Sequence, residues 1–177
     1  CASRGDTSMR WFTTLIFILL IVQGYALIFM VPTFDMNNPI IEVYAQVNEE
    51  GTEVTVVFLD EDHPNPIVDL IYDIFRFFKY GRVKDVETFF ISENEVYFSG
   101  VYASATSFFE TENLHHTKRV NIENFEIYDG ETVIYVNTWN HMFCEKPLPG
   151  IPYVPVMVNS FLIGSREDVE KIYSWRH

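Results

Sequence analysis

The spacing of hydrophobic and polar positions divides this chain into segments with different periods. Apolar residues alternate with mostly polar ones over 40–48, a period of two that is typical of a half-buried strand. The letters "NEEG" (48–51) predict a turn, after which 52–59 is expected to return as a second strand. The first folded elements are therefore expected to be two antiparallel strands.

A helical period follows in "NPIVDLIYDIFRFFKYG" (65–81). Asn65 is a good N-cap, Pro66 suits the first helical position, and Gly81 suits the left-handed residue after the last turn. The acidic run 60–62 just before it would complement the helix dipole. The apolar positions are Ile67, Val68, Leu70, Ile71, Tyr72, Ile74, Phe75 and Phe78. So wide a stripe predicts a helix that is covered on more than one side and lies on a sheet.

Four further strands are predicted after the helix, over 86–91, 95–109, 118–128 and 131–139. Gly100 predicts a bulge or a close backbone approach, and a slip in the alternation near Glu123 and Asn124 predicts another bulge. Asp129-Gly130 is a typical two-residue hairpin turn. We expect these strands to form an antiparallel meander.

The last part of the chain combines an extended segment, short strands and a helix. Four prolines stiffen 147–155, and 156–163 is expected to form one or two short strands. Ser165 and Asp168 have the spacing of a capping box, which predicts a short helix to about Trp175. The fold class is therefore α+β: a mostly antiparallel sheet of about six or seven strands, one long helix packed on it and a short C-terminal helix.

The N-terminal part has the layout of a targeting segment. Met9-Arg10 gives a positive start, 11–22 carries no charge, and small residues precede a cleavage position after Ala26, as in a signal peptide. Because the uncharged run continues to Val31, it is also long enough for a retained membrane anchor. We therefore expect a signal peptide or anchor over 1–31, a linker over 32–39 and a single domain over 40–177.

Both alternatives place the domain outside the cytoplasm, secreted or anchored to the membrane by its N-terminal segment. Residues 1–8 precede Met9, and whether they belong to the natural protein is left open.

Composition and charge limit the classes of molecule that this chain can bind. Of the 177 residues, 48% are hydrophobic, including 16 Phe, which is typical of a packed domain and not of a disordered chain. The net charge of −13 argues against nucleic acid and against an anionic membrane surface, because both are bound through Lys and Arg. The two cysteines, Cys1 and Cys144, do not form a disulfide framework within the domain.

Few residues have the spacing of a reactive site. His115, His116, His141 and Cys144 are candidate ligands for zinc or copper, although no motif supports them. His141 and Cys144 are also a candidate base and nucleophile, because one helical turn would bring them together.

The aromatic side chains offer a second type of site. A curved sheet covered by an apolar helix encloses either solid core or a cavity for an apolar, lipid-like ligand. The candidate lining residues are Phe75, Phe98, Tyr102, Phe125 and Trp139.

We therefore expect a non-catalytic binding module with a protein or an apolar small molecule as its partner, and with the membrane as a partner if the N-terminal segment is retained. No cofactor is expected. One alternative is a metal-assisted or thiol hydrolase that uses His115, His116, His141 and Cys144. The other is a structural subunit that adds Leu27–Phe34 as a strand to a neighbour's sheet edge.

Overall fold

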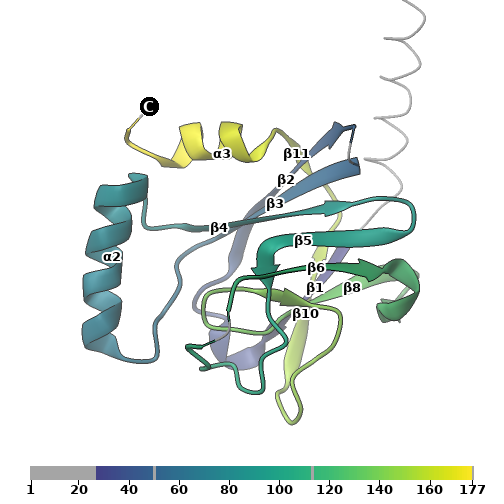
Figure 1. Cartoon of the computed structure of the whole chain (residues 1–177), viewed down its shortest axis with the longest axis horizontal. Helices are drawn as coiled ribbons and strands as arrows, with labels where there is room; N and C mark the ends of the chain where they lie inside the picture. The colour runs from purple at the N-terminus through teal and green to yellow at the C-terminus, as the bar shows by residue number, and fades with distance from the viewer. Residues whose placement is uncertain (1–26, 50, 113, 177) are drawn as a thin grey trace, which may run out of the picture.

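A computed structural model describes residues 27–177 with the exception of 50, 113 and 177 (Figure 1). In this part of the chain, eleven strands form one mixed sheet in the order β10-β1-β8-β9-β5-β4-β3-β2-β11, with β6 beside β5 and β7 beside β8. The strands are β1 (Leu27–Pro32), β2 (Ile40–Asn48), β3 (Gly51–Phe58), β4 (Asp85–Ile91), β5 (Glu95–Tyr102), β6 (His116–Asn121), β7 (Ile127–Tyr128), β8 (Glu131–Val136), β9 (Phe143–Cys144), β10 (Tyr153–Val158) and β11 (Leu162–Ile163). The helices are α2 (Pro66–Tyr80) and α3 (Arg166–Tyr173), with 3-10 turns η1 (Thr33–Asp35) and η2 (Ile122–Asn124).

The α+β class is confirmed, but the predicted mostly antiparallel sheet of six or seven strands is wrong. Three pairs are parallel, β1 with β8, β2 with β11 and β5 with β9. Several strands are only two residues long, and β1 was predicted only in one alternative, as a strand added to a neighbour's sheet edge. Short bridges and parallel pairings depend on contacts between distant segments, which a local period does not reveal.

Strand β1 lies inside the sheet. Its residues pair with β10 on one side and with β8 on the other, and Leu27, Ile28 and Phe29 are almost completely buried. A strand that is buried on both faces is a continuous apolar run, so by composition alone 27–31 also fits a continuation of the uncharged segment before it. These five residues belong to the sheet, whereas the predicted cleavage site and residues 9–26 lie outside the described residues.

The predicted linker 32–39 also belongs to the domain. It contains η1, and its Asp35 and Asn38 side chains are buried. Among the described residues, no helix is long and apolar enough to cross a membrane.

The central antiparallel part of the sheet follows the predicted order β2, β3, β4, β5 and β6. The bulge near Gly100 is confirmed, because the β5–β6 register shifts between Phe98 and Tyr102. Asp129 and Gly130 have positive φ angles of 51° and 88°, as the predicted hairpin turn requires.

The predicted meander is wrong at its last strand. β8 does not continue from β6 but crosses to the other half of the sheet, where it pairs with β1, β7 and β9. The parallel partner β1 lies about a hundred residues earlier in the chain, so only the tertiary structure shows that β8 pairs with β1 and not with β6.

The main core lies between the two halves of the sheet. Five phenylalanine side chains at its centre have no exposed surface: Phe29, Phe58, Phe89, Phe98 and Phe143. Their rings pack edge-on or tilted, for example with centroids 5.1 Å apart between Phe89 and Phe143.

Helix α2 has both of the predicted ends, whereas α3 begins as predicted and ends at Tyr173, two residues before Trp175. Asn65 accepts hydrogen bonds from the backbone N–H groups of Ile67 and Val68, and Gly81 ends α2 with a φ of 74°. The Ser165–Asp168 capping box begins α3. Helix α3 packs on the sheet through Val169, which contacts a small cluster that contains Val57 and Val86 (the other member is Tyr44).

Helix α2 does not pack as predicted. In Figure 1 it stands beside the sheet at one end of the molecule and does not lie across a sheet face. Within α2, all of whose residues are described, Arg76 is the one buried residue. The expected burial of its apolar stripe is therefore wrong, and the reason lies in the polar residues around Arg76.

Candidate functional site

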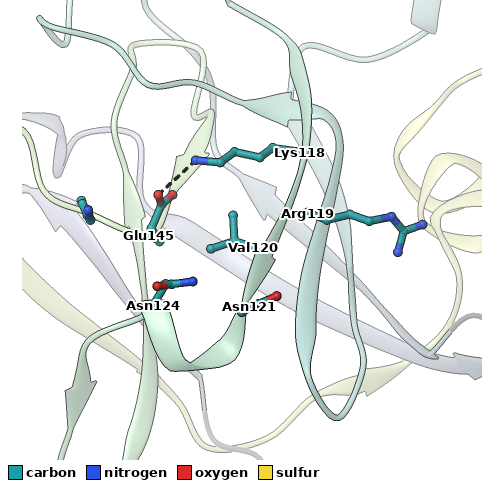
Figure 2. A pocket seen from close by; sticks show the side chains of 7 residues that line it. Lys118, Arg119, Val120, Asn121, Asn124 and Glu145 are labelled. Atoms are coloured by element: carbon teal, nitrogen blue, oxygen red, sulfur yellow. Dashed lines mark hydrogen bonds and ion pairs between the residues drawn. The ribbon is translucent and has the colours of Figure 1, made fainter.

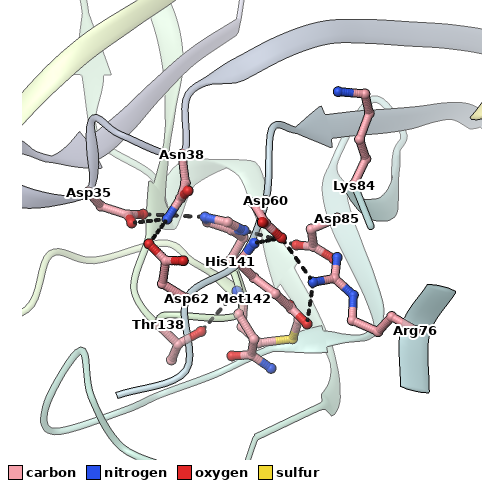
Figure 3. Close-up of polar contacts among 12 residues, drawn as sticks. Asp35, Asn38, Asp60, Asp62, Arg76, Lys84, Asp85, Thr138, His141 and Met142 are labelled. Atoms are coloured by element: carbon pink, nitrogen blue, oxygen red, sulfur yellow. Dashed lines mark hydrogen bonds and ion pairs between the residues drawn. The ribbon is translucent and has the colours of Figure 1, made fainter. Parts of the chain in front are cut away.

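Polar side chains, most of them buried, gather where α2 meets the sheet (Figure 3). We call this cluster the polar junction. It combines side chains from η1 and the turn after it, the β3–α2 loop, α2, the start of β4 and the β8–β9 loop. Its members are Asp35, Asn38, Asp60, Glu61, Asp62, Arg76, Asp85 and His141.

His141 is the centre of the polar junction and has no exposed surface. Its Nδ1 lies 2.9 Å from Asp85 Oδ2, and its Nε2 lies 3.3 Å from Asp35 Oδ2. Its ring stacks on Phe58 with centroids 3.9 Å apart and an interplanar angle of 2°. Burial disfavours a charged ring, but the two carboxylates outweigh burial and raise the pKa of His141 to about 9. The side chain is therefore a buried imidazolium between two carboxylates.

The loop holds His141 in an uncommon backbone conformation with a φ of 54°. Its N–H donates to Thr138 O at 2.9 Å, and the next N–H, of Met142, donates to Thr138 Oγ1 at 2.9 Å. On the other side of the ring, Asn38 Nδ2 donates to Asp35 Oδ1 at 3.2 Å. These bonds orient both partners of the ion pair.

Arg76 joins α2 to the polar junction. Its Nη1 lies 3.3 Å from Asp60 Oδ1, 3.4 Å from Glu61 Oε1 and 3.7 Å from Asp73 Oδ1. Burial and then the nearby Asp85 carboxylate raise the pKa of Glu61 to about 8. The acidic run that was expected to serve the helix dipole therefore anchors a buried guanidinium as well.

The position of Arg76 fixes the direction of the apolar side of α2. Residues two positions apart on a helix lie about 200° apart, so Ile74 and Phe78 point away from Arg76. We define the α2 apolar face as seven side chains that are exposed by 43% to 71%. They are Ile67, Leu70, Ile71, Ile74, Phe75, Phe77 and Phe78. This is the reverse of an ordinary surface helix, which buries its apolar stripe.

The C-terminal residues extend this face. Trp175 is 56% exposed, and its ring lies 5.8 Å from that of Phe77. Its backbone N–H donates to Gly81 O at 3.0 Å, and its Nε1 donates to Phe77 O at 3.2 Å. Arg82 also connects this end of α2 to α3 through two hydrogen bonds with Glu170, of 2.8 and 2.9 Å. The face therefore belongs to a fixed part of the molecule.

The predicted metal and catalytic residues are not gathered into one site. His141 is enclosed by Asp35 and Asp85, whereas Cys144 is buried and contacts Tyr102 and Glu145. His115 and His116 are exposed: His115 contacts Gly100 O and Asn140 Nδ2, and His116 pairs with Tyr102 in the sheet. Within the described part of the chain, no group of three or more His, Cys, Asp or Glu side chains could hold a metal ion.

The five predicted ligand-binding aromatics are also separated. Phe98, Tyr102 and Phe125 are buried in the main core, where Phe98 lies 5.7 Å from Tyr102 and 6.3 Å from Phe125 between ring centroids. Trp139 is buried in a smaller cluster with Phe108 and Leu148, and Phe75 is exposed on the α2 apolar face. Phe98 thus packs against Tyr102 and Phe125 in the main core, whereas Trp139 and Phe75 lie outside it.

A surface hollow of about 350 Å³ lies beside β6 (Figure 2). Its lining residues are Lys118, Arg119, Val120, Asn121, Asn124, Glu145 and Lys146. Lys118 Nζ lies 3.1 Å from Glu145 Oε1, and Arg119 points away from the hollow and pairs with Glu95. Two of the three cations around the hollow are therefore already neutralised.

Comparisons of this chain with protein-family models, with curated proteins and with solved structures found no match.

The sequence interpretation missed the roles of Asp35, Glu61, Arg76 and Asp85. One signal was present: Arg76 is the single cation in the middle of a wide apolar helix, and the acidic residues that could pair with it lie just before that helix. Asp35 and Asp85 gave no signal, because they come from distant parts of the chain. The apolar stripe of α2 can be recognised in the sequence, but the sequence does not show that this stripe is exposed.

Proposed function

We propose that this chain is a non-catalytic binding module that works outside the cytoplasm, and that it binds a protein through the α2 apolar face. The observation that carries the proposal is the reversed orientation of α2. A charged side chain is buried on one side of this helix while seven large apolar side chains are exposed on the other. Large contiguous apolar patches are characteristic of interaction sites.

The size of the face supports a macromolecular partner. Seven side chains that are each about half exposed present on the order of 700 Å² of apolar surface, since a large side chain offers roughly 150–250 Å². The largest patch on a typical monomer is about 300–600 Å². A standard protein interface buries about 800 Å² on each partner. The α2 apolar face therefore has the size of a protein interface.

The polar junction gives the face its rigidity. Contacts of Arg76 with Asp60 and Glu61 hold the inner side of α2, and the hydrogen bonds of Trp175 hold its C-terminal end. A helix held in this way loses little conformational freedom when a partner binds. The uncharged segment before Leu27 supports a place outside the cytoplasm.

The hydrolase and strand-addition alternatives are less well supported. His141 has no exposed surface, and both of its ring nitrogens face carboxylates, so it cannot reach a substrate without a large rearrangement. Both edges of β1 are paired within the chain, so Leu27–Pro32 is not free to complete a neighbour's sheet.

Site-specific photo-cross-linking tests the proposal. The full chain is produced in a secreting host with p-benzoylphenylalanine at Phe78 on the α2 apolar face, or at Tyr128 on β7. Both side chains are aromatic and at least half exposed (60% and 51%), so the two positions are matched. We expect a discrete protein adduct from position 78 and none from position 128. The absence of a protein adduct at position 78 would overturn the proposal.

A further inference from the structure

We propose that the partner of the α2 apolar face is a second copy of this chain, with the two α2 helices packed antiparallel around a two-fold axis near Ile74. This inference rests on the proposed function, because it names the occupant of the same face. It is carried by the area of the face, by the spacing of its residues and by the positions of the nearby charges.

The area fits a symmetric dimer. A face of on the order of 700 Å² per copy approaches the roughly 800 Å² that each partner buries in a standard interface. Trp175 extends the same surface beyond the end of α2. Two-fold dimers are the commonest oligomers, and they use one self-complementary patch on both copies.

The spacing makes the face self-complementary. Relative to Ile74, apolar side chains stand at −7, −4 and −3 (Ile67, Leu70, Ile71) and at +3 and +4 (Phe77, Phe78). In an antiparallel pair, the aliphatic half of one helix meets the aromatic half of the other. Rows of side chains three and four positions apart are the ridges through which helices pack at 8–10 Å. Trp175 lies next to Gly81, at the position that faces Ile67 of the second copy.

The charges favour this partner over a membrane. The carboxylates of α2, Asp69 and Asp73, are half-buried on the side of Arg76, so the repulsion between two acidic chains acts away from the contact. A helix that lies on a membrane usually carries Lys and Arg on its solvent side. Here the polar side faces the protein's own domain, and the net charge of −13 is repelled by anionic lipids.

Two differently tagged copies of the full chain provide the test. Both are co-expressed in a secreting host, one of them with p-benzoylphenylalanine at Phe78. We expect an adduct of about twice the 20.8 kDa chain mass that carries both tags. An adduct that lacks the second tag shows another protein as the partner, which overturns this inference and leaves the proposed function intact. No protein adduct overturns both.

Two substitutions locate the contact. Ile74→Asp places a charge at the two-fold axis and is expected to weaken dimerisation at least about tenfold, the scale of a residue at an interface centre. Its control is Ile163→Asp, because Ile163 is 81% exposed on the edge strand β11. A dimer that survives Ile74→Asp as well as it survives Ile163→Asp would contradict the inference.

Disulfide formation tests the geometry without relying on loss of binding. In a Cys1→Ser background, Ile74→Cys is expected to link two copies on mild oxidation, because the two Cα atoms face each other across the axis. Ile67→Cys lies seven residues from the axis, so its counterpart would be roughly 21 Å away along the helices, and it should not link. Equal linkage at both positions, or linkage at neither, would overturn the antiparallel arrangement.

Discussion

Arg76→Met removes the cation that joins α2 to the polar junction and keeps an apolar stem of similar length. The loss of stability should depend on pH, because the three carboxylates around Arg76 differ in burial. The side chains of Asp60 and Asp73 are 31% and 30% exposed, so water can solvate them in the variant. The side chain of Glu61 is only 5% exposed and depends on Arg76 when it is ionised.

At pH 6, Glu61 is neutral in the folded protein, because its pKa is raised to about 8. The variant then loses two partly exposed ion pairs, each worth up to about 1 kcal/mol, so we expect a loss of about 2 kcal/mol. At pH 9 the wild type holds an ionised Glu61 next to Arg76. In the variant Glu61 takes up a proton and does not remain an unpaired charge, so the extra loss at pH 9, one unit above the wild-type pKa of about 8, is limited to about 1.4 kcal/mol, and we expect a total loss of about 3 kcal/mol.

Urea unfolding at pH 6 and pH 9 measures both values. Circular dichroism follows the whole domain, and tryptophan fluorescence reports on α2, because the ring of Trp139 lies 6.3 Å from that of Tyr72 and the ring of Trp175 lies 5.8 Å from that of Phe77. Lys79→Met is the matched control: it removes an exposed cation from the same helix and should change stability by less than about 0.5 kcal/mol. Equal losses at the two pH values, or a loss no larger than that of Lys79→Met, would refute the reasoning.

Three further predictions follow from buried groups and backbone geometry. In the folded protein the pKa of Glu61 is raised from 4.5 to about 8, and that of His141 from 6.5 to about 9. The folded state therefore binds more protons than the unfolded state between pH 4.5 and 8 at Glu61 and between pH 6.5 and 9 at His141, and stability falls as pH rises through these two ranges. Urea unfolding should show a slope approaching about 1.4 kcal/mol per pH unit for each group; stability that rises from pH 6 to 9 would contradict this. Gly51→Ala should lower the free energy of unfolding by about 2–3 kcal/mol, because the new Cβ would lie 2.5 Å from Ile91 O. Gly130→Ala should lower it by only about 1 kcal/mol, because its Cβ would meet open space. Equal losses in thermal unfolding would show that the contact with Ile91 is unimportant. Phe29→Ala should lower the free energy of unfolding by about 3–5 kcal/mol, as measured by denaturant unfolding; a small loss would show that β1 is dispensable.

The sequence by itself determined the local elements. Asn65, Pro66 and Gly81 set the ends of α2, the Ser165–Asp168 box begins α3, and Asp129-Gly130 forms the hairpin. Each of these signals acts within a few residues, because caps and turns satisfy backbone groups of their immediate neighbours. Such elements can therefore be predicted without knowledge of the rest of the chain.

Only the tertiary structure decided which faces are buried. The stripe on α2 predicted burial, but Arg76 meets Asp60 and Glu61 on the opposite side, and burying this ion-pair network turns the stripe outward. The apolar run at 27–31 fits a membrane segment or a buried strand equally well, and its partners β8 and β10 begin at residues 131 and 153. His141 is placed between Asp35 and Asp85 by contacts over 106 and 56 positions. Pairings over such distances arise from the free energy of the whole packed domain, and no local pattern encodes them.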